Sequence, residues 1–163
     1  MTKRELDAQL ARITDPDPLM RLDAARRLGQ LDAPGPDGTA ALITALNDRE
    51  WSVRAAAAEG LGRLESDSAL FSLCEQLEHP RTEVRRAAVN ALDAIGDRQA
   101  TAPLILRLER ERHNETRRLI VRALGRLGDD RALGPLQRLR GDKHWAVRSE
   151  AVAASERIMT RQE

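Results

Sequence analysis

One phrase occurs five times along this chain, at intervals of 31 to 33 residues. Its copies read MRLDAARRLGQL from Met20, VRAAAAEGLGRL from Val53, VRRAAVNALDAI from Val84, TRRLIVRALGRL from Thr116 and VRSEAVAASERI from Val147. A repeat of this length is typical of a solenoid, in which each unit buries its apolar face only by stacking on its neighbours. The repeat therefore predicts the fold more strongly than any other feature of the sequence.

The composition indicates that the repeats are helical. The chain has 163 residues, and only 2% of them are aromatic, so leucine, alanine, isoleucine and valine must form the core. That set suits closely packed helices better than a β-sandwich, which favours valine, threonine and aromatic residues. We therefore predict an all-α solenoid of about ten helices, forming one domain over residues 1–163. Its two-helix repeats cover approximately residues 1–32, 33–65, 66–96, 97–128 and 129–163.

Each repeat is expected to contain a helix A followed by a helix B, and helix B carries the phrase. Counted from its arginine, apolar or small residues fall at positions −1, +3, +7 and +10, which cluster on one side of a helix. Gly96 and Gly128 follow B helices and are expected to supply left-handed C-caps. The helices are predicted at residues 2–14, 18–31, 38–47, 50–64, 67–78, 81–95, 98–112, 114–127, 131–140 and 144–160.

The phrase resembles the short HEAT repeats of phycobilin-lyase-type proteins. The shared pattern is Asp, two or three residues, Val-Arg, a run of alanines and Leu-Gly, and it covers nearly the whole chain. Thr116 and Ser155 depart from it, and we attribute Ser155 to a terminal helix that no further repeat covers. The resemblance implies a ladder between repeats, in which arginines pair with loop aspartates. It assigns this structural role to Arg54, Arg85, Arg117, Arg148, Asp48 and Asp142.

The B helices are expected to line the concave face of the solenoid, where residues vary from repeat to repeat. In the fourth repeat, Arg118, Arg122 and Arg126 recur at intervals of four residues. Like charges at that spacing cost a few tenths of a kcal/mol per pair. We interpret them as a site for an acidic partner segment, and a solvated charged face is the alternative. The predicted partner-binding residues are Trp51, Glu59, Arg63, Arg86, Asn90, Arg118, Arg122, Arg126 and Arg157.

Trp51 and Trp145 each precede the arginine of their phrase by three residues. The shared position favours packing at the start of helix B. The alternative is a role at the centre of an interface, where tryptophan is enriched.

The sequence does not favour catalysis, a cofactor or a bound metal. His79, His113 and His144 lie in A–B turns of different repeats. Turns of stacked repeats should be about 8–10 Å apart, which is too far for three imidazoles to share one metal ion. Cys74 lies in a leucine stripe and is expected to be a small buried hydrophobic residue. No glycine-rich phosphate loop is present.

These observations favour a non-enzymatic adaptor that binds another protein through its concave B-helix face. An accessory subunit of a bilin-lyase-like attachment enzyme is the first alternative, and a binder of nucleic-acid backbone is the second. The net charge of +1 and the scarcity of aromatic residues do not favour nucleic acid. No apolar run reaches the length of about 20 residues that a membrane span needs, so we expect a cytoplasmic protein with no membrane contact.

Overall fold

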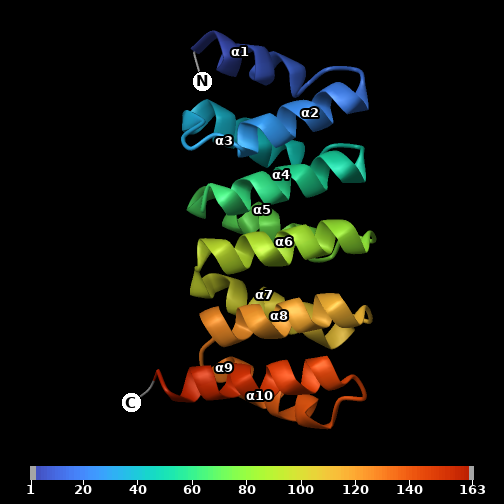
Figure 1. Ribbon diagram of the computed structural model, residues 1–163, viewed down its shortest axis with the longest axis vertical. Helices are drawn as coiled ribbons and strands as arrows, with labels where there is room; N and C mark the ends of the chain where they lie inside the picture. Colours follow the sequence, from blue (N-terminus) through green and yellow to red (C-terminus); the bar gives the residue numbers. More distant parts are fainter. Residues whose placement is uncertain (1–2, 162–163) are drawn as a thin grey trace. The chain divides into compact units, whose positions relative to one another are not determined.

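The computed structural model describes residues 3–161, and all regular secondary structure in that range is helical (Figure 1). The described part of the chain contains ten α-helices and three short 3₁₀ helices. It divides into two compact units, with the boundary between Ile95 and Gly96. The all-α helical-repeat fold predicted from the sequence is confirmed. The single continuous domain over residues 1–163 stays a prediction.

The first unit contains three A helices and three B helices. The A helices are α1 (Lys3–Arg12), α3 (Gly35–Ala45) and α5 (Leu70–Gln76), the last preceded by the 3₁₀ helix η1 (Asp67–Ala69). The B helices are α2 (Pro18–Gly29), α4 (Trp51–Arg63) and α6 (Thr82–Ile95). The B helices lie side by side with α4 in the middle, and each A helix packs on the B helix that follows it (Figure 1).

The second unit contains two further repeats. Its A helices are α7 (Thr101–Arg110), which follows η2 (Arg98–Ala100), and α9 (Asp130–Arg138), which precedes η3 (Leu139–Gly141). Its B helices are α8 (Asn114–Leu127) and α10 (Trp145–Met159). Helix α10 packs against both α8 and α9, and α7 contacts α8 and α9.

The predicted helices agree with these bounds to within three residues at each described end, and residue 2 lies outside the described range. Helix α3 begins earlier than expected because Pro36 lies in its first turn, where proline is well tolerated. Gly96 has a φ of 81° and is left-handed as predicted. Gly128 does not follow that prediction, because its φ is −62°.

The predicted apolar stripe forms the core. Position +3 is fully buried in every repeat, as Ala24, Ala57, Ala88, Ile120 and Ala151.

Two predictions on this stripe are wrong. Met20 is 42% exposed, although the equivalent residue in each other repeat is fully buried. Ser155 is buried as well, and its hydroxyl donates to the carbonyl of Ala151, so no uncovered helix end explains it.

Neighbouring B helices approach closely through glycine and alanine. The glycine at position +8 faces position +6 of the next B helix: Gly29 faces Gly60, Gly62 faces Ala91, and Gly125 faces Ala154. A Cβ added to Gly62 would lie 2.7 Å from the Cα of Ala91. These glycines are needed for helix spacing, since no side chain fits there.

Candidate functional site

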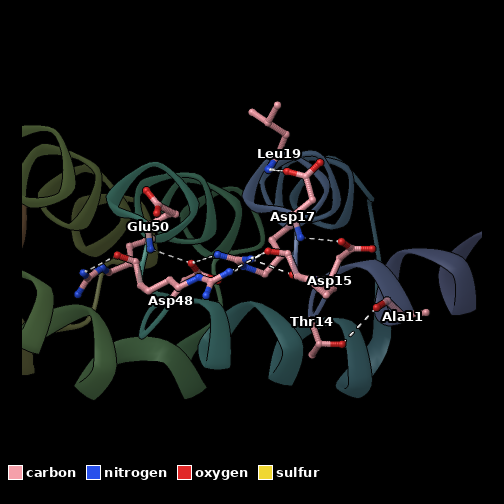
Figure 2. Close-up of polar contacts among 11 residues, drawn as sticks. Ala11, Thr14, Asp15, Asp17, Leu19, Asp48 and Glu50 are labelled. Carbon is pink, nitrogen blue, oxygen red and sulfur yellow. Dashed lines mark hydrogen bonds and ion pairs between the residues drawn. The ribbon is translucent and has the colours of Figure 1, made fainter.

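The five A–B turns share one hydrogen bond, although the residue that accepts it differs. The residue six positions before the repeat arginine accepts the backbone N–H two residues later. The acceptors are Asp15, Asp48, His79, Glu111 and Asp142, and Figure 2 shows the first two of these contacts. Asp48 and Asp142 therefore stabilise the turn ahead of the helix, whereas the N-cap positions are Glu50 and His144.

The repeat arginine binds the same turn through main-chain carbonyls. Arg21 Nη1 donates to the carbonyls of Asp15 and Pro16, at 2.8 and 3.0 Å. Arg85 and Arg148 make the equivalent pair of bonds to the carbonyls five and six residues before them. Each arginine thus ties its own B helix to the loop that leads into it.

Arg21 and Arg117 also reach the turn of the next repeat. Arg21 Nε and Nη2 donate to the two carboxylate oxygens of Asp48, at 2.6 and 2.9 Å, and both side chains are at least nine-tenths buried. Arg117 Nη2 donates to Asp142 Oδ2 in the second unit. The structure therefore brings Asp48 and Asp142 to arginines of the preceding repeat. We call each such contact a ladder pair.

The ladder pairs shift the ionisation of their carboxylates. Burial raises the pKa of Asp48, but hydrogen bonds from Arg21 and the Glu50 amide, with the arginine charge, outweigh it, and the pKa lies below its ordinary value. The pKa of Asp142 is lowered chiefly by its hydrogen bond from Arg117. Both carboxylates are therefore held in the charged form that the ladder requires.

Arg54 is the exception within the first unit. Arg54 is the equivalent of Arg21 in the second repeat. The turn that follows Arg21 contains Asp48, whereas the turn that follows Arg54 has His79 at the equivalent position. Arg54 Nη2 donates a hydrogen bond to the carbonyl of Arg49, at 3.4 Å. Its Nε is buried and has no hydrogen-bond partner in the described part of the chain. The resemblance placed Arg54 in the ladder, but no carboxylate among residues 3–161 pairs with it.

The basic residues predicted on the fourth repeat lie on α8. Arg126 is exposed, and Arg118 and Arg122 are half-buried. Arg118 forms an ion pair with Glu115 at 2.7 Å, and this hydrogen bond raises the pKa of Arg118. Arg157 of α10 packs beside α8, since a Cβ on Gly125 would meet its Nη1 at 3.3 Å. We call Arg118, Arg122, Arg126 and Arg157 the basic group.

Sequence reasoning missed one member of this surface. Glu150 of α10 lies 3.2 Å from Arg157 and 4.0 Å from Arg118, so one carboxylate joins two arginines from different helices. The seven-residue spacing of Glu150 and Arg157 on one helix was the signal that could have revealed it. Glu150 therefore reduces the positive charge of the surface at Arg118 and Arg157.

The predicted surface residues of the first unit lie on α4 and α6. Glu59, Arg63 and Asn90 line one shallow hollow between these helices. Arg63 also donates from Nε to the carbonyl of Gly29, at 2.9 Å, and so has a structural contact. Arg86 is exposed on α6.

The two tryptophans are in different surroundings. Trp51 is 38% exposed, and the guanidinium of Arg81 lies 5.7 Å from its ring centre, a cation–π distance. Trp145 is 70% exposed. The prediction that both pack at the start of helix B is therefore wrong for Trp145.

The other reactive side chains do not converge. Cys74 is half-buried on α5 rather than buried as expected. Within residues 3–161, no group of three His, Cys, Asp or Glu residues is placed to hold a metal ion. In the same range, no helix has both the length and the apolar character to cross a membrane.

Comparison with known proteins identifies the repeat. The family model for HEAT repeats matches residues 39–111 and 101–163. A HEAT repeat-containing taxis protein of Halobacterium salinarum is 35% identical over 58% of this chain, which covers 28% of that relative. The chain therefore spans well under half the length of this relative.

Two of the solved structures that resemble this chain illustrate its fold. One is the complex of CpcE and CpcF of phycocyanin lyase from Nostoc sp. PCC7120, with a TM-score of 0.85, 25% identity, and coverage of 95% of this chain and 65% of that one. The other is a computationally designed armadillo repeat protein for modular peptide recognition, with a TM-score of 0.66 and 21% identity over 91% and 80% of the two chains. Because the family model covers most of the sequence, the chain belongs to the HEAT-repeat family.

Proposed function

We propose that this protein is a non-enzymatic, cytoplasmic adaptor that binds an acidic segment of another protein through its B-helix face. The observation that carries the proposal is the basic group on α8 and α10. Its arginines are exposed or half-buried and lie on adjacent helices. The HEAT-repeat fold is suited to protein interaction, because stacked helices present an extended surface.

Arginine is well matched to such a partner. Its planar guanidinium binds a carboxylate through two parallel hydrogen bonds. The contact of Arg118 with Glu115 has this form, with Nε and Nη2 each donating to one oxygen, at 3.0 and 2.7 Å. A partner carboxylate would bind an arginine of the group in the same way. Electrostatic complementarity of this kind mainly determines specificity and association rate.

Charge reversal tests the proposal. The double variant Arg122→Glu/Arg126→Glu and the wild type are each immobilised, and proteins captured from the native cytoplasm are quantified by mass spectrometry. The matched control is Arg26→Glu/Arg140→Glu, which makes the same charge change at exposed positions outside the basic group. We expect the first variant to lose partners that the control retains. Equal capture by all three proteins would contradict a role for the basic group.

An accessory role in chromophore attachment is the second candidate, favoured by the likeness to the phycocyanin lyase complex. The matched structure is a complex of two proteins, CpcE and CpcF, so in this role the chain would act with a second protein. Co-expression with such a protein, a bilin and an acceptor protein would then give a covalently coloured product. A colourless acceptor under those conditions leaves the adaptor function as the conclusion.

Binding to nucleic-acid backbone makes a separable prediction. Phosphate contacts release counterions, so affinity would fall steeply with salt. Partners of the basic group that are removed by nuclease treatment would support this alternative and contradict a protein partner.

A further inference from the structure

A complete ladder pair satisfies two needs with one aspartate. Asp48 Oδ1 accepts both the Glu50 amide, at 2.8 Å, and Arg21 Nη2, while its Oδ2 accepts Arg21 Nε. In Asp142, Oδ1 likewise accepts the His144 amide and Oδ2 accepts Arg117 Nη2. The first need is a turn that presents helix B. The second is a negative charge for the arginine of the preceding repeat.

His79 meets the first need but not the second. Its Nδ1 accepts the Arg81 amide at 3.0 Å, just as Asp48 accepts the amide of Glu50. A neutral imidazole that accepts at Nδ1 carries its proton on Nε2 and has no second acceptor. The ring therefore offers Arg54 neither charge nor a lone pair. This explains why the turn of the third repeat is normal while Arg54 lacks a ladder partner.

Further cations surround this position. Arg81 and Arg85 follow His79 in the same turn and helix, and with Arg54 they lower the pKa of His79 beyond the effect of its burial. Arg81 lies over Trp51, at the start of the helix that contains Arg54. Arg54 itself is only half-buried, so solvent reaches part of its side chain. The result is a positively charged site with a buried N–H donor that no described residue satisfies.

We propose that Arg54 is the receptor for one carboxylate of an acidic segment of a partner protein, which supplies from the solvent side the charge that Asp48 supplies to Arg21. Because Nε is buried, the Nη groups of Arg54 would donate to the carboxylate. Arg81 and Trp51 lie at the edge of the site and would contact the neighbouring residues of the segment. The site consists of residues of the first unit only, so it stands or fails independently of the basic group.

Arginine Nε–H signals in ¹H–¹⁵N NMR spectra test the proposal directly. The Arg54 signal is assigned in the wild type by through-bond correlation to its own backbone amide and is checked by its loss in Arg54→Lys. Acetate is then titrated at constant ionic strength with chloride as the reference ion, followed by inorganic phosphate and a capped peptide of sequence Gly-Asp-Gly. We expect acetate and the peptide to shift the Arg54 signal with Kd values in the millimolar range. The wild-type titration alone can decide the question, whether or not the variants fold.

Two substitutions at one position supply the matched pair. His79→Asn keeps an acceptor for the Arg81 amide but adds no charge, so binding should remain within about threefold of wild type. His79→Asp supplies the missing carboxylate, so acetate affinity should fall at least tenfold. An unshifted Arg54 signal in the wild type would overturn the proposal. So would an equal response in His79→Asp, or phosphate binding tighter than that of either carboxylate probe.

Discussion

Replacing Gly62 by alanine should destabilise the protein, although alanine is the better helix former. Gly62 lies within α4, where glycine costs about 1 kcal/mol relative to alanine. The added methyl carbon, however, would lie 2.7 Å from the Cα and 3.0 Å from the Cβ of Ala91. Favourable carbon–carbon contacts lie at about 3.5–4.0 Å, so α4 and α6 would have to separate.

The cost of that separation follows from the position of α4. This helix packs between α2 and α6, and a shift away from Ala91 moves it toward α2, where Gly60 already meets Gly29. Overpacking in a well-packed core costs about 1–3 kcal/mol. Subtracting the gain in helix propensity leaves a net loss of up to about 2 kcal/mol in the free energy of unfolding.

Gly134 provides the matched control. It is an exposed glycine within α9, and a Cβ there would meet nothing closer than Arg138 Nη1 at 3.9 Å. Gly134→Ala should therefore gain at most about 1 kcal/mol from propensity, because the ring of Pro135 disfavours helical backbone at a residue with a Cβ before it. The propensity gain is at least as large in Gly62→Ala, so the difference between the two variants is a lower bound on the steric cost, expected at about 1–3 kcal/mol.

Urea unfolding followed by circular dichroism at 222 nm measures both variants. Fluorescence of Trp51 in a Trp145→Phe background reports separately on the first unit, which contains Gly62. The expected order of stability is Gly134→Ala, wild type, then Gly62→Ala. If Gly62→Ala is as stable as Gly134→Ala, the close approach of the B helices imposes no steric constraint, and our explanation of the Leu-Gly element is wrong.

Four further variants probe the ladder, the surface and the core. Asp48→Ala should lower the free energy of unfolding at pH 7 by about 3 kcal/mol, since it leaves Arg21 buried and unpaired. The depressed pKa of Asp48 stabilises the wild type above the unfolded value of about 4, and this contribution is lost as the pH falls through the folded value, so urea midpoints of Asp48→Ala should vary less in acid. Burial and nearby arginines lower the pKa of His79, so wild-type stability should fall as the pH drops below about 6.5, and His79→Asn should reduce that slope. Trp145→Ser should change the unfolding free energy by less than about 0.5 kcal/mol, whereas Leu124→Ala should cost about 2–5 kcal/mol, and thermal melts showing the reverse order would contradict the observed burial.

The sequence predicted the helices well because their signals are local. A stripe at positions −1, +3, +7 and +10 identifies one side of a helix, and short turns with proline or glycine delimit it. Leu92 and Leu124, both at position +7, are fully buried as this stripe requires. The predicted burial of Met20 was wrong because burial also depends on which neighbouring element covers a residue, and the periodicity of the sequence carries no information about that.

The site was harder to predict because its contacts join different repeats. Arg21 meets Asp48 across 27 positions, and Glu150 lies near Arg118 across 32. A helical wheel places residues around one axis but says nothing of the register between neighbouring helices. Only the resemblance to HEAT repeats pointed to the ladder, and it did not reveal that His79 leaves Arg54 without a carboxylate.

The turn position six residues before the repeat arginine explains how one repeat can differ in charge from the others and keep the same fold. Any acceptor there closes the turn, and Asp48, His79 and Glu111 all do so. Only a carboxylate also pairs with the arginine of the preceding repeat. The arginine of the third repeat, Arg85, still binds the carbonyls of its own turn, because main-chain groups do not depend on side-chain identity. Exchange of aspartate for histidine therefore alters electrostatics at Arg54 while leaving the geometry of the repeat intact, and such a position can acquire a ligand at little cost to folding.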